Sequence, residues 1–164
     1  MYTVEQQLED LQGHLDRVRD NGHLLGKRLM EKGRKDFGWQ LIYRCHIHDA
    51  SKFHGIERKY MHQGEDLVDI SMLRQAIEQH TTTNSHHPEY HGNIHNMPEL
   101  DIAEMVCDCA ARAQESGTDI RKWFTDIAVG KYNIGLQSQQ WKWIQEFLDL
   151  LLKTSFKKGV NTNA

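Results

Sequence analysis

Apolar residues recur every three or four positions along most of the chain, and the first stretch shows this most clearly. A single stripe runs through Val4, Leu8, Leu11, Leu15, Val18, Gly22, Leu25 and Leu29. This spacing places side chains on one face of an α-helix. The pattern predicts a helix over residues 4–32, ended by Gly33.

The same periodicity continues beyond a charged connector at residues 33–37. It predicts a second helix to about residue 53, a short one at 57–61, and longer helices over 66–80, 98–114, 118–131 and 137–154. Pro98 suits a first helical turn, and Thr118 suits a helix N-cap. Residues 81–91 are predicted to be a polar loop, and residues 157–164 a flexible C-terminal tail.

The last predicted helix carries two apolar stripes instead of one. They consist of Trp141, Ile144, Phe147, Leu148, Leu151 and Leu152 on one side, and Trp143, Phe147 and Leu150 on the other. A helix that is apolar on two sides is either buried deeply or part of an interface. Both alternatives stay open, including a homodimer through the C-terminal helix.

Strand-like alternation is absent, so the expected fold class is all-α, a single-domain bundle of about five to six helices over residues 1–156. The formal net charge of −3 offers no basic field, so general nucleic-acid binding is not expected. No apolar run approaches 18 residues and no leader-like segment occurs, so we expect no membrane association. Three cysteines without framework spacing indicate a reducing compartment, and the chain is expected to be cytoplasmic.

Candidate chemistry is densest in the stretch from residue 44 to residue 53. If the second helix runs through it, His48 and Asp49 lie about 100° apart and can still reach one cation beside the helix. Lys52 then lies one turn beyond His48 and could hold an anion. The alternative is a plain buried ion pair between Asp49 and Lys52 or Arg44.

Histidine is unusually abundant. The chain has eleven, and nine of them fall between residues 46 and 95. Neutral imidazole is the commonest metal-binding side chain, so this enrichment beside carboxylates indicates a metal site. His14 lies about 65° from the centre of the first apolar stripe and His23 about 115° from it, so His14 is the one predicted to point inward. His80 ends a helix that is expected to face the core.

Two further candidates come from the loop and the helix after it. The polar loop carries His86 and His87, and a loop with so many polar side chains often serves function, although a solvated loop is the alternative. On the next predicted helix, Asp108 has Glu104 one turn before it and Arg112 one turn after it. This ladder could orient Asp108, or it could be a surface charge ladder.

Taken in order, His14, His48-Asp49, His80, His86-His87 and Asp108 resemble the ligand series of the HD-domain superfamily of metal-dependent phosphohydrolases. The resemblance covers residues 10–112. More narrowly, His-Asp-x-Ser-Lys-Phe, Asn-x-His-His-Pro-Glu-Tyr and Glu-Met-x-x-Asp resemble a small, uncharacterised and often phage-encoded branch of that group. The loop at residues 84–90 departs from the better-known diesterase branches.

The resemblance implies a helical HD-like fold and one or two divalent ions, which could be Mn, Fe, Co, Ni, Zn or Mg. Its implied ligands are His14, His48, Asp49 and Asp108, with His80 and His86 or His87 at a second position. The implied activity is hydrolysis of a small phosphoester, most simply a nucleotide, by a metal-activated water in the cytoplasm, or in the host cytoplasm if the protein is phage-encoded. Lys52 would hold a phosphate oxygen, while His80 and His87 could bind phosphate or protonate the leaving oxygen.

Three other interpretations remain at this point. The first is a non-catalytic nucleotide-binding protein that keeps the pocket. The second is a metal-independent ribonuclease, because Arg74 and His80 match an Arg-x4-6-His spacing. The third is a structural zinc site from Cys45, His48, Cys107 and Cys109, although Cys107 and Cys109 lie about 200° apart on a helix.

Overall fold

The first helix is long and well capped. The structure is a computed structural model that describes residues 3–63 and 68–153, and its helix α1 spans Val4–Glu31. Thr3 begins the helix with a capping box: its hydroxyl accepts from the backbone of Gln6, and the Gln6 side chain accepts from the backbone of Thr3. Gly33 follows with a φ of 87°, which only glycine adopts without strain, so the predicted end is confirmed.

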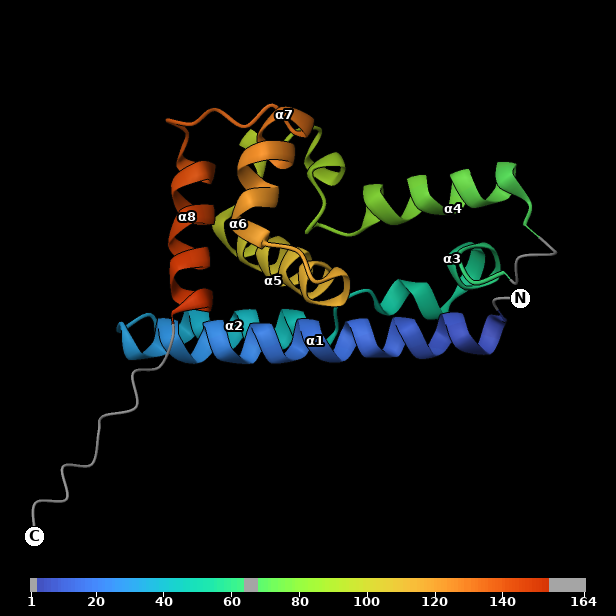
Figure 1. The fold of residues 1–164 in the computed structure, drawn as a ribbon, viewed down its shortest axis with the longest axis horizontal. Coiled ribbons are helices and arrows are strands. Elements are labelled where there is room, and N and C mark those ends of the chain that lie inside the picture. The colour runs from blue at the N-terminus through green and yellow to red at the C-terminus, as the bar shows by residue number, and fades with distance from the viewer. Residues whose placement is uncertain (1–2, 64–67, 154–164) are drawn as a thin grey trace, which may run out of the picture.

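Helix α2 (Lys35–His46) runs alongside α1 (Figure 1). Small residues let the two backbones approach closely, since a Cβ added to Gly26 would lie 2.7 Å from the carbonyl oxygen of Gly38. The prediction that this helix continues to residue 53 is wrong. It ends at His46, and a separate 3₁₀ turn covers Ala50–Phe53. Because the helix does not continue, the apolar residues Ile47 and Phe53 are exposed rather than buried.

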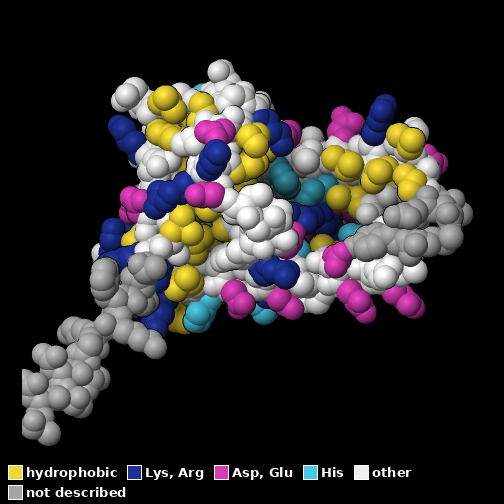
Figure 2. All heavy atoms as spheres, in the orientation of Figure 1, with side chains coloured by type: hydrophobic (Ala, Val, Ile, Leu, Met, Phe, Trp, Pro, Cys, Tyr) yellow, Lys and Arg dark blue, Asp and Glu magenta, His cyan; other side chains and the backbone are white. Residues whose placement is uncertain are grey.

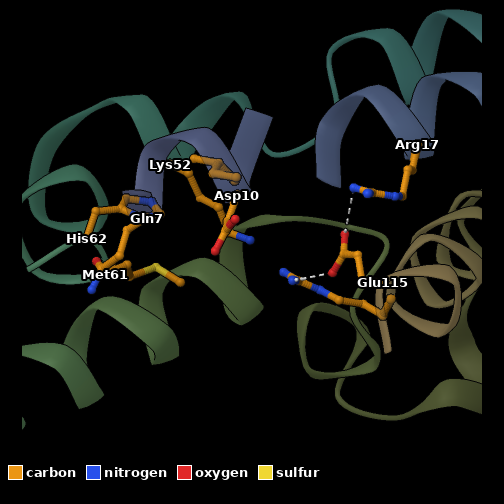
Figure 3. Close-up of a pocket in the computed structure, with 9 residues that line it drawn as sticks. Gln7, Asp10, Arg17, Lys52, Met61, His62 and Glu115 are labelled. Carbon is orange, nitrogen blue, oxygen red and sulfur yellow. Dashed lines mark hydrogen bonds and ion pairs between the residues drawn. The ribbon is translucent and has the colours of Figure 1, made fainter. Parts of the chain in front are cut away.

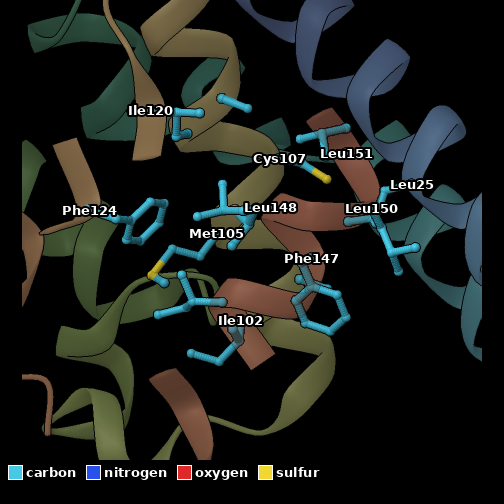
Figure 4. Packing of buried hydrophobic residues seen from close by; sticks show 14 of the residues in the cluster. Leu25, Ile102, Met105, Cys107, Ile120, Phe124, Phe147, Leu148, Leu150 and Leu151 are labelled. Carbon is cyan, nitrogen blue, oxygen red and sulfur yellow. The ribbon is translucent and has the colours of Figure 1, made fainter. Parts of the chain in front are cut away.

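The apolar core lies where α5 (Glu99–Ser116) and α8 (Gln139–Leu152) stand against α1 and α2 (Figures 1 and 4). Phe147 and Leu148 of α8 are fully buried there with Ile102 of α5 and Leu25 of α1. Both apolar stripes of α8 contribute, because Leu150 is also buried within the chain. Burial in the fold therefore accounts for most of both stripes, although Leu152 is 42 % exposed, and the homodimer stays a prediction.

Between α5 and α8 the chain forms a helical segment that was predicted as one helix over 118–131. It consists of α6 (Ile120–Trp123), a π-helical stretch (Phe124–Ala128) and α7 (Val129–Lys131). The N-cap is Asp119, whose carboxylate accepts from the backbone of Arg121 and Lys122, so the prediction of Thr118 as the cap is wrong by one residue. Phe124 anchors the segment in the core.

On the other side of the molecule, α3 (Gly55–Tyr60) and α4 (Ile70–Thr83) form an arm (Figure 1). Helix α4 contacts α3 and the 3₁₀ turn Pro88–His91, so its face is not covered as the apolar pattern predicted. Ile70 and Ile77 are 62 % and 44 % exposed, whereas His80 is buried. The predicted start of this helix at residue 66 lies outside the described residues.

The fold class is confirmed. The described residues are all helical or irregular, with a further 3₁₀ turn at Ile94–Asn96, and they contain no strand. Within these residues, no helix has the length and apolar character that crossing a membrane requires. The predicted flexible tail at 157–164 lies outside the described part.

Candidate metal centre

Asp49 occupies an unusual backbone position directly after α2. Its φ of 55° and ψ of 23° place it in the left-handed region, which Asp tolerates better than most residues. This reversal turns His48 and Asp49 together into the interior, where each is 3 % exposed. The pair therefore reaches the core from a turn and not from the helical face that the sequence predicted.

The first group of converging side chains comes from three separate segments. His14 of α1, His48 and Asp108 of α5 each offer one ligand atom within 4.8 Å of the others. His14 Nε2 lies 3.0 Å from Asp108 Oδ1, and His48 Nε2 lies 3.8 Å from the same oxygen. Asp49 Oδ2 is 3.5 Å from His48 Nε2, so it borders this group as well.

A second group of candidate ligands shares Asp49 with the first. Asp49, His80, His86 and His87 also lie within ligand reach of a common point. Asp49 Oδ1 is 3.3 Å from His80 Nε2 and 3.4 Å from His86 Nε2, and the Nε2 atoms of His80 and His87 are 3.1 Å apart. The structure thus brings together every metal-ligand candidate predicted from the sequence, with both His86 and His87 at the second position.

Behind these histidines stands a second layer of carboxylates. Glu115 lies 2.7 Å from His14 Nδ1, Glu104 lies 2.9 Å from His48 Nδ1, and Glu57 lies 2.8 Å from His80 Nδ1. A carboxylate on Nδ1 holds the N–H there and leaves the lone pair on Nε2, which is how metal-binding histidines are usually oriented. Glu57 and Glu104 are almost fully buried.

Glu57 and Glu115 were not among the predicted site residues, and Glu104 contacts His48 and not Asp108 as the spacing suggested. Glu104 pairs with His48, and Arg112 pairs with Glu115 at 3.1 Å, so neither belongs to a ladder around Asp108. A signal was present, because four carboxylates follow one another along α5 at helical spacing within an apolar face. They are Asp101, Glu104, Asp108 and Glu115.

Several buried polar atoms at the centre have no hydrogen-bond partner among the described residues. They include the Nε2 atoms of His14, His48 and His86 and the Oδ1 atom of Asp49. His14 Nε2 is within 3.0 Å of Asp108 Oδ1, but the pair does not have hydrogen-bonding geometry. Buried polar atoms are rarely left unsatisfied, and bare nitrogen lone pairs facing carboxylate oxygens repel one another. A cation among them would satisfy all four atoms, so the residues present fit a bound metal ion.

The pKa shifts of the central histidines and of Asp49 also indicate that positive charge stabilises the cluster. Burial by itself lowers the pKa of His48, but Asp49, Glu104 and Asp108 outweigh it and raise that pKa. Burial would raise the pKa of Asp49, yet His48, Lys52 and His86 hold it well below its ordinary value. Burial and the charge of His48 lower the pKa of His86. The carboxylates of Asp49, and of Asp108 whose pKa is also lowered, therefore stay ionised and are stabilised by protonated imidazoles or a cation beside them.

Of the two ion pairs considered for Asp49, the structure contains the one with Lys52. Lys52 Nζ lies 2.6 Å from Asp49 Oδ2, and the side chain is buried. Arg44 instead binds Asp101 and Glu104 of α5, at 2.7 and 2.6 Å. The guanidinium of Arg44 is therefore the charge partner of two carboxylates on α5.

Arg44 and Asp101 also fix the loop that carries His86 and His87. Ser85 Oγ donates to Asp101 Oδ1 at 2.9 Å, and His91 Nε2 lies 3.1 Å from Asp101 Oδ2. This network attaches both ends of the loop to α5. His86 is consequently held from two sides even though it lies outside regular helix.

Other sequence candidates lie away from the centre. His23 is exposed while His14 is 1 % exposed, which agrees with the predicted helical phase. Cys45 and Cys107 are packed in the apolar core, and the metal-ligand groups found among the described residues contain no cysteine. Arg74 is on the exposed side of α4, apart from the buried His80.

A cavity of about 550 Å³ opens beside the centre, lined among others by Lys52, Arg17, Arg112 and Glu115 (Figure 3). Figure 2 shows histidine and Lys or Arg side chains within the hollow next to the α4 arm. Lys52 and Glu115 each contact a candidate ligand, Asp49 and His14 respectively. The cavity therefore borders the histidine–carboxylate cluster directly.

The fold and these groups define an all-helical protein with a buried histidine–carboxylate centre that could hold a metal ion. The chain belongs to a family of unknown function (DUF5662), which matches residues 3–150. No curated protein and no solved structure matches the chain. The family description assigns no activity, so a functional argument has to start from the site.

Proposed function

We propose that the protein is a metal-dependent phosphohydrolase that acts on a nucleotide or a related small phosphoester. The observation that carries the proposal is the convergence of unpartnered Nε2 atoms of His14, His48 and His86 on Asp49, in a buried cluster backed by carboxylates. Structural histidines in a core are normally hydrogen-bonded on both sides or exposed on one. Here the inward side faces carboxylate oxygens and other imidazole nitrogens of the same cluster.

The resemblance to HD-domain phosphohydrolases supports the same conclusion. In that resemblance the ligand order is His, His-Asp, further histidines and Asp, and His14, His48-Asp49, His80, His86-His87 and Asp108 follow it. These residues come from α1, the turn after α2, α4, the 84–87 loop and α5, which are far apart in the sequence. Their gathering in one centre is difficult to attribute to chance.

The donor set favours particular ions. Imidazole nitrogens predominate over carboxylate oxygens, which suits Mn, Fe, Co, Ni or Zn better than Mg. The two ligand groups share Asp49, whose Oδ2 faces His48 and whose Oδ1 faces His80 and His86. Two adjacent ions, which we favour, would be held by His14, His48 and Asp108 and by His80, His86 and His87, with Asp49 available to both groups. When bound, such ions activate a water molecule as nucleophile and polarise a phosphoryl oxygen.

The remaining residues supply charge and protons. Lys52 lies on the cavity wall, and its ammonium group can neutralise a non-bridging phosphoryl oxygen. His87 is half-buried beside His80, and burial together with the charge of His80 lowers its pKa. Either imidazole, when not occupied as a ligand, can protonate the leaving oxygen.

The test is hydrolysis of p-nitrophenyl phosphate and bis(p-nitrophenyl) phosphate by protein loaded with Mn²⁺ or Co²⁺. We expect turnover that Asp49→Asn abolishes while the helical circular dichroism is retained, because the shape of the side chain is kept and only the carboxylate charge is lost. Asp36→Asn on the first turn of α2 is the matched control and should behave as wild type. Equal turnover in the Asp49 variant would refute the assignment.

A chain that binds nucleotides but hydrolyses neither substrate at high protein concentration would instead support the non-catalytic alternative. Preference between the two substrates also bears on the number of ions. A diester needs both its attacking and leaving oxygens stabilised, which two ions do best. Hydrolysis of the monoester alone would favour a single ion, with His80 and His87 as phosphate or acid groups.

A further inference from the structure

The second group of candidate ligands is carried by three short segments. Asp49 directly precedes the 3₁₀ turn Ala50–Phe53, His80 lies in the last turn of α4, and His86 and His87 lie in the loop that follows that helix. These segments have to be fixed relative to one another if their side chains are to reach one ion. The structure contains a hydrogen-bonded connection that does this.

Glu57 is the first member of the connection, and it lies on α3. Its Oε2 is 2.8 Å from His80 Nδ1, and the side chain is 1 % exposed. Ser51 Oγ donates to the same oxygen at 2.8 Å. Helix α3 packs against both the 3₁₀ turn and α4 (Figure 1). Glu57 therefore connects the segment that follows Asp49 with the helix that carries His80.

Asn84 extends the connection to the loop. Its side-chain amide donates to Ser51 Oγ at 3.1 Å and to the backbone carbonyl of His80 at 2.9 Å. Asn84 is also the first residue after α4, at the start of the loop that carries the other two imidazoles. All three ligand-bearing segments are thus connected to one hydrogen-bonded triad, which consists of Ser51, Glu57 and Asn84.

The direction of these hydrogen bonds sets the tautomer of His80. Because the oxygen of Ser51 accepts from Asn84, its hydroxyl hydrogen is available to donate to Glu57. Glu57 then accepts from Ser51 and from Nδ1 of His80, which places the ring proton on Nδ1 and the lone pair on Nε2. That Nε2 atom lies 3.3 Å from Asp49 Oδ1, on the side of the second ligand group.

Glu57 differs from the other two supporting carboxylates in its charge partners. Glu104 and Glu115 each have an arginine nitrogen within 3.1 Å. In the described part of the chain, the only basic side chain within ion-pair distance of Glu57 is that of His80. A buried carboxylate is costly without positive charge near it. Glu57 therefore depends on His80, and on any ion that His80 binds, more than the other two depend on their histidines.

We propose that the triad is the positioning element of the second metal position and that the first position does not depend on it. The inference rests on the proposed function for the presence of two ions. Among the hydrogen bonds and ion pairs of the described residues, those of His14, His48 and Asp108 involve Asp49 and the other carboxylates and imidazoles of the centre, and none involves the triad. Loss of the triad should consequently convert a paired arrangement into a single ion.

Titration of metal-free protein with Mn²⁺, followed by electron paramagnetic resonance, counts the bound ions and distinguishes a lone ion from an adjacent, spin-coupled pair. Wild type should bind two coupled ions. Glu57→Gln keeps the shape of the side chain and should weaken binding of the second ion about ten- to a hundredfold, which leaves a lone-ion signal. Ser51→Ala removes one hydrogen bond and should weaken it about two- to tenfold. Glu78→Gln, at an exposed position of α4, is the matched control and should bind both ions as wild type does.

Anomalous diffraction from a Glu57→Gln crystal, soaked at a Mn²⁺ concentration between the two affinities, identifies the position that is lost. The peak at His14, His48 and Asp108 should remain, and the peak at His80 should disappear. Wild-type affinity for both ions in the two triad variants, loss of both peaks, or a wild-type protein that binds one ion only would each overturn the inference. Two ions in wild type, one in Glu57→Gln and no turnover of either phosphoester would support the triad and contradict only the catalytic proposal.

Discussion

The middle and the C-terminal end of α1 lie in two different kinds of interior. Toward its C-terminal end, Leu25 packs with Phe147 and Leu148 in an apolar core, where burial itself is the stabilising interaction (Figure 4). At its middle, His14 lies in an interior of histidines and carboxylates, where burial is costly unless each group is paired. One half of the molecule is stabilised by exclusion of water, and the other by a network of histidines and carboxylates that could hold a metal ion.

This difference predicts that substitutions in the two regions will affect different properties. The core needs only shape and apolar surface, so a change there should alter stability and leave ligand chemistry intact. The polar centre is held by directed contacts such as His48 to Glu104 and Arg44 to Asp101, so a change there should alter metal affinity first. Each substitution below tests whether the two halves respond in these different ways.

The largest change in stability is expected in the core. Phe147 is fully buried and stacks on Phe37 with ring centroids 6.1 Å apart. Phe147→Ala should reduce the free energy of unfolding by about 3–5 kcal/mol, because it leaves a cavity. Urea denaturation of the metal-free protein measures this, and Trp39→Ala, at a 56 % exposed position, is the control that should change little. Metal stoichiometry per folded molecule should stay as in wild type.

In the polar half, the clearest contrast is between two histidines of the same helix. His14→Ala should weaken metal affinity by about ten- to a hundredfold or more, because the variant loses a direct ligand. His23→Ala should be near neutral, because that side chain is exposed. Competition with a chelator measures both affinities. Equal metal affinities of the two variants, or a weaker affinity in the His23 variant, would show that His14 is not a metal ligand.

A smaller effect is expected behind the ligands. Glu104→Gln keeps the shape but removes the charge that holds His48 Nδ1 and pairs with Arg44. Metal affinity should fall by about tenfold, at the lower end for such supporting residues. Glu146→Gln, on α8 beside Arg34, is a matched control outside the polar half. If both variants bind metal alike, the carboxylate layer does not support the centre.

The smallest effect is expected on the α4 arm. Ile77→Ser should change the free energy of unfolding by no more than about 0.5 kcal/mol, since the side chain is already exposed. Ala76→Leu on the same helix should cost about 1–3 kcal/mol, because Ala76 has no exposed surface. Thermal or urea unfolding measures the free energy of unfolding of both variants. A large loss of stability for Ile77→Ser would mean that the apolar face of the α4 arm is covered in solution.

The same contrast explains what could be predicted from the sequence. The extents of α1 and α5 and the inward direction of His14 follow from apolar periodicity, because one side of each helix packs on the core. The end of α2 at His46 could not be predicted in this way, because no glycine or proline marks it. The chain reverses instead at Asp49, which adopts a left-handed conformation. Periodicity also failed on α4, where apolar residues face solvent.

The supporting carboxylates were hard to find for a related reason. The chain has 23 acidic residues, and Glu57 and Glu115 differ from the others only in what lies opposite them in space. Glu104 could be singled out by its spacing from Asp108, but its partner His48 is 56 residues away. The candidate ligands were singled out one by one from helical phase and histidine enrichment, and their order resembles a known series, which carries long-range information that local patterns lack.

The central claim is that metal ions occupy the histidine–carboxylate cluster, and anomalous diffraction from a crystal soaked in Mn²⁺ tests it most directly. The account predicts two adjacent peaks, each about 2.0–2.3 Å from imidazole Nε2 or carboxylate oxygen atoms, with Asp49 contacting both. One peak at His14, His48 and Asp108, with His80 and His87 far from any ion, would contradict the paired arrangement. The absence of any peak at the cluster would contradict the metal centre itself.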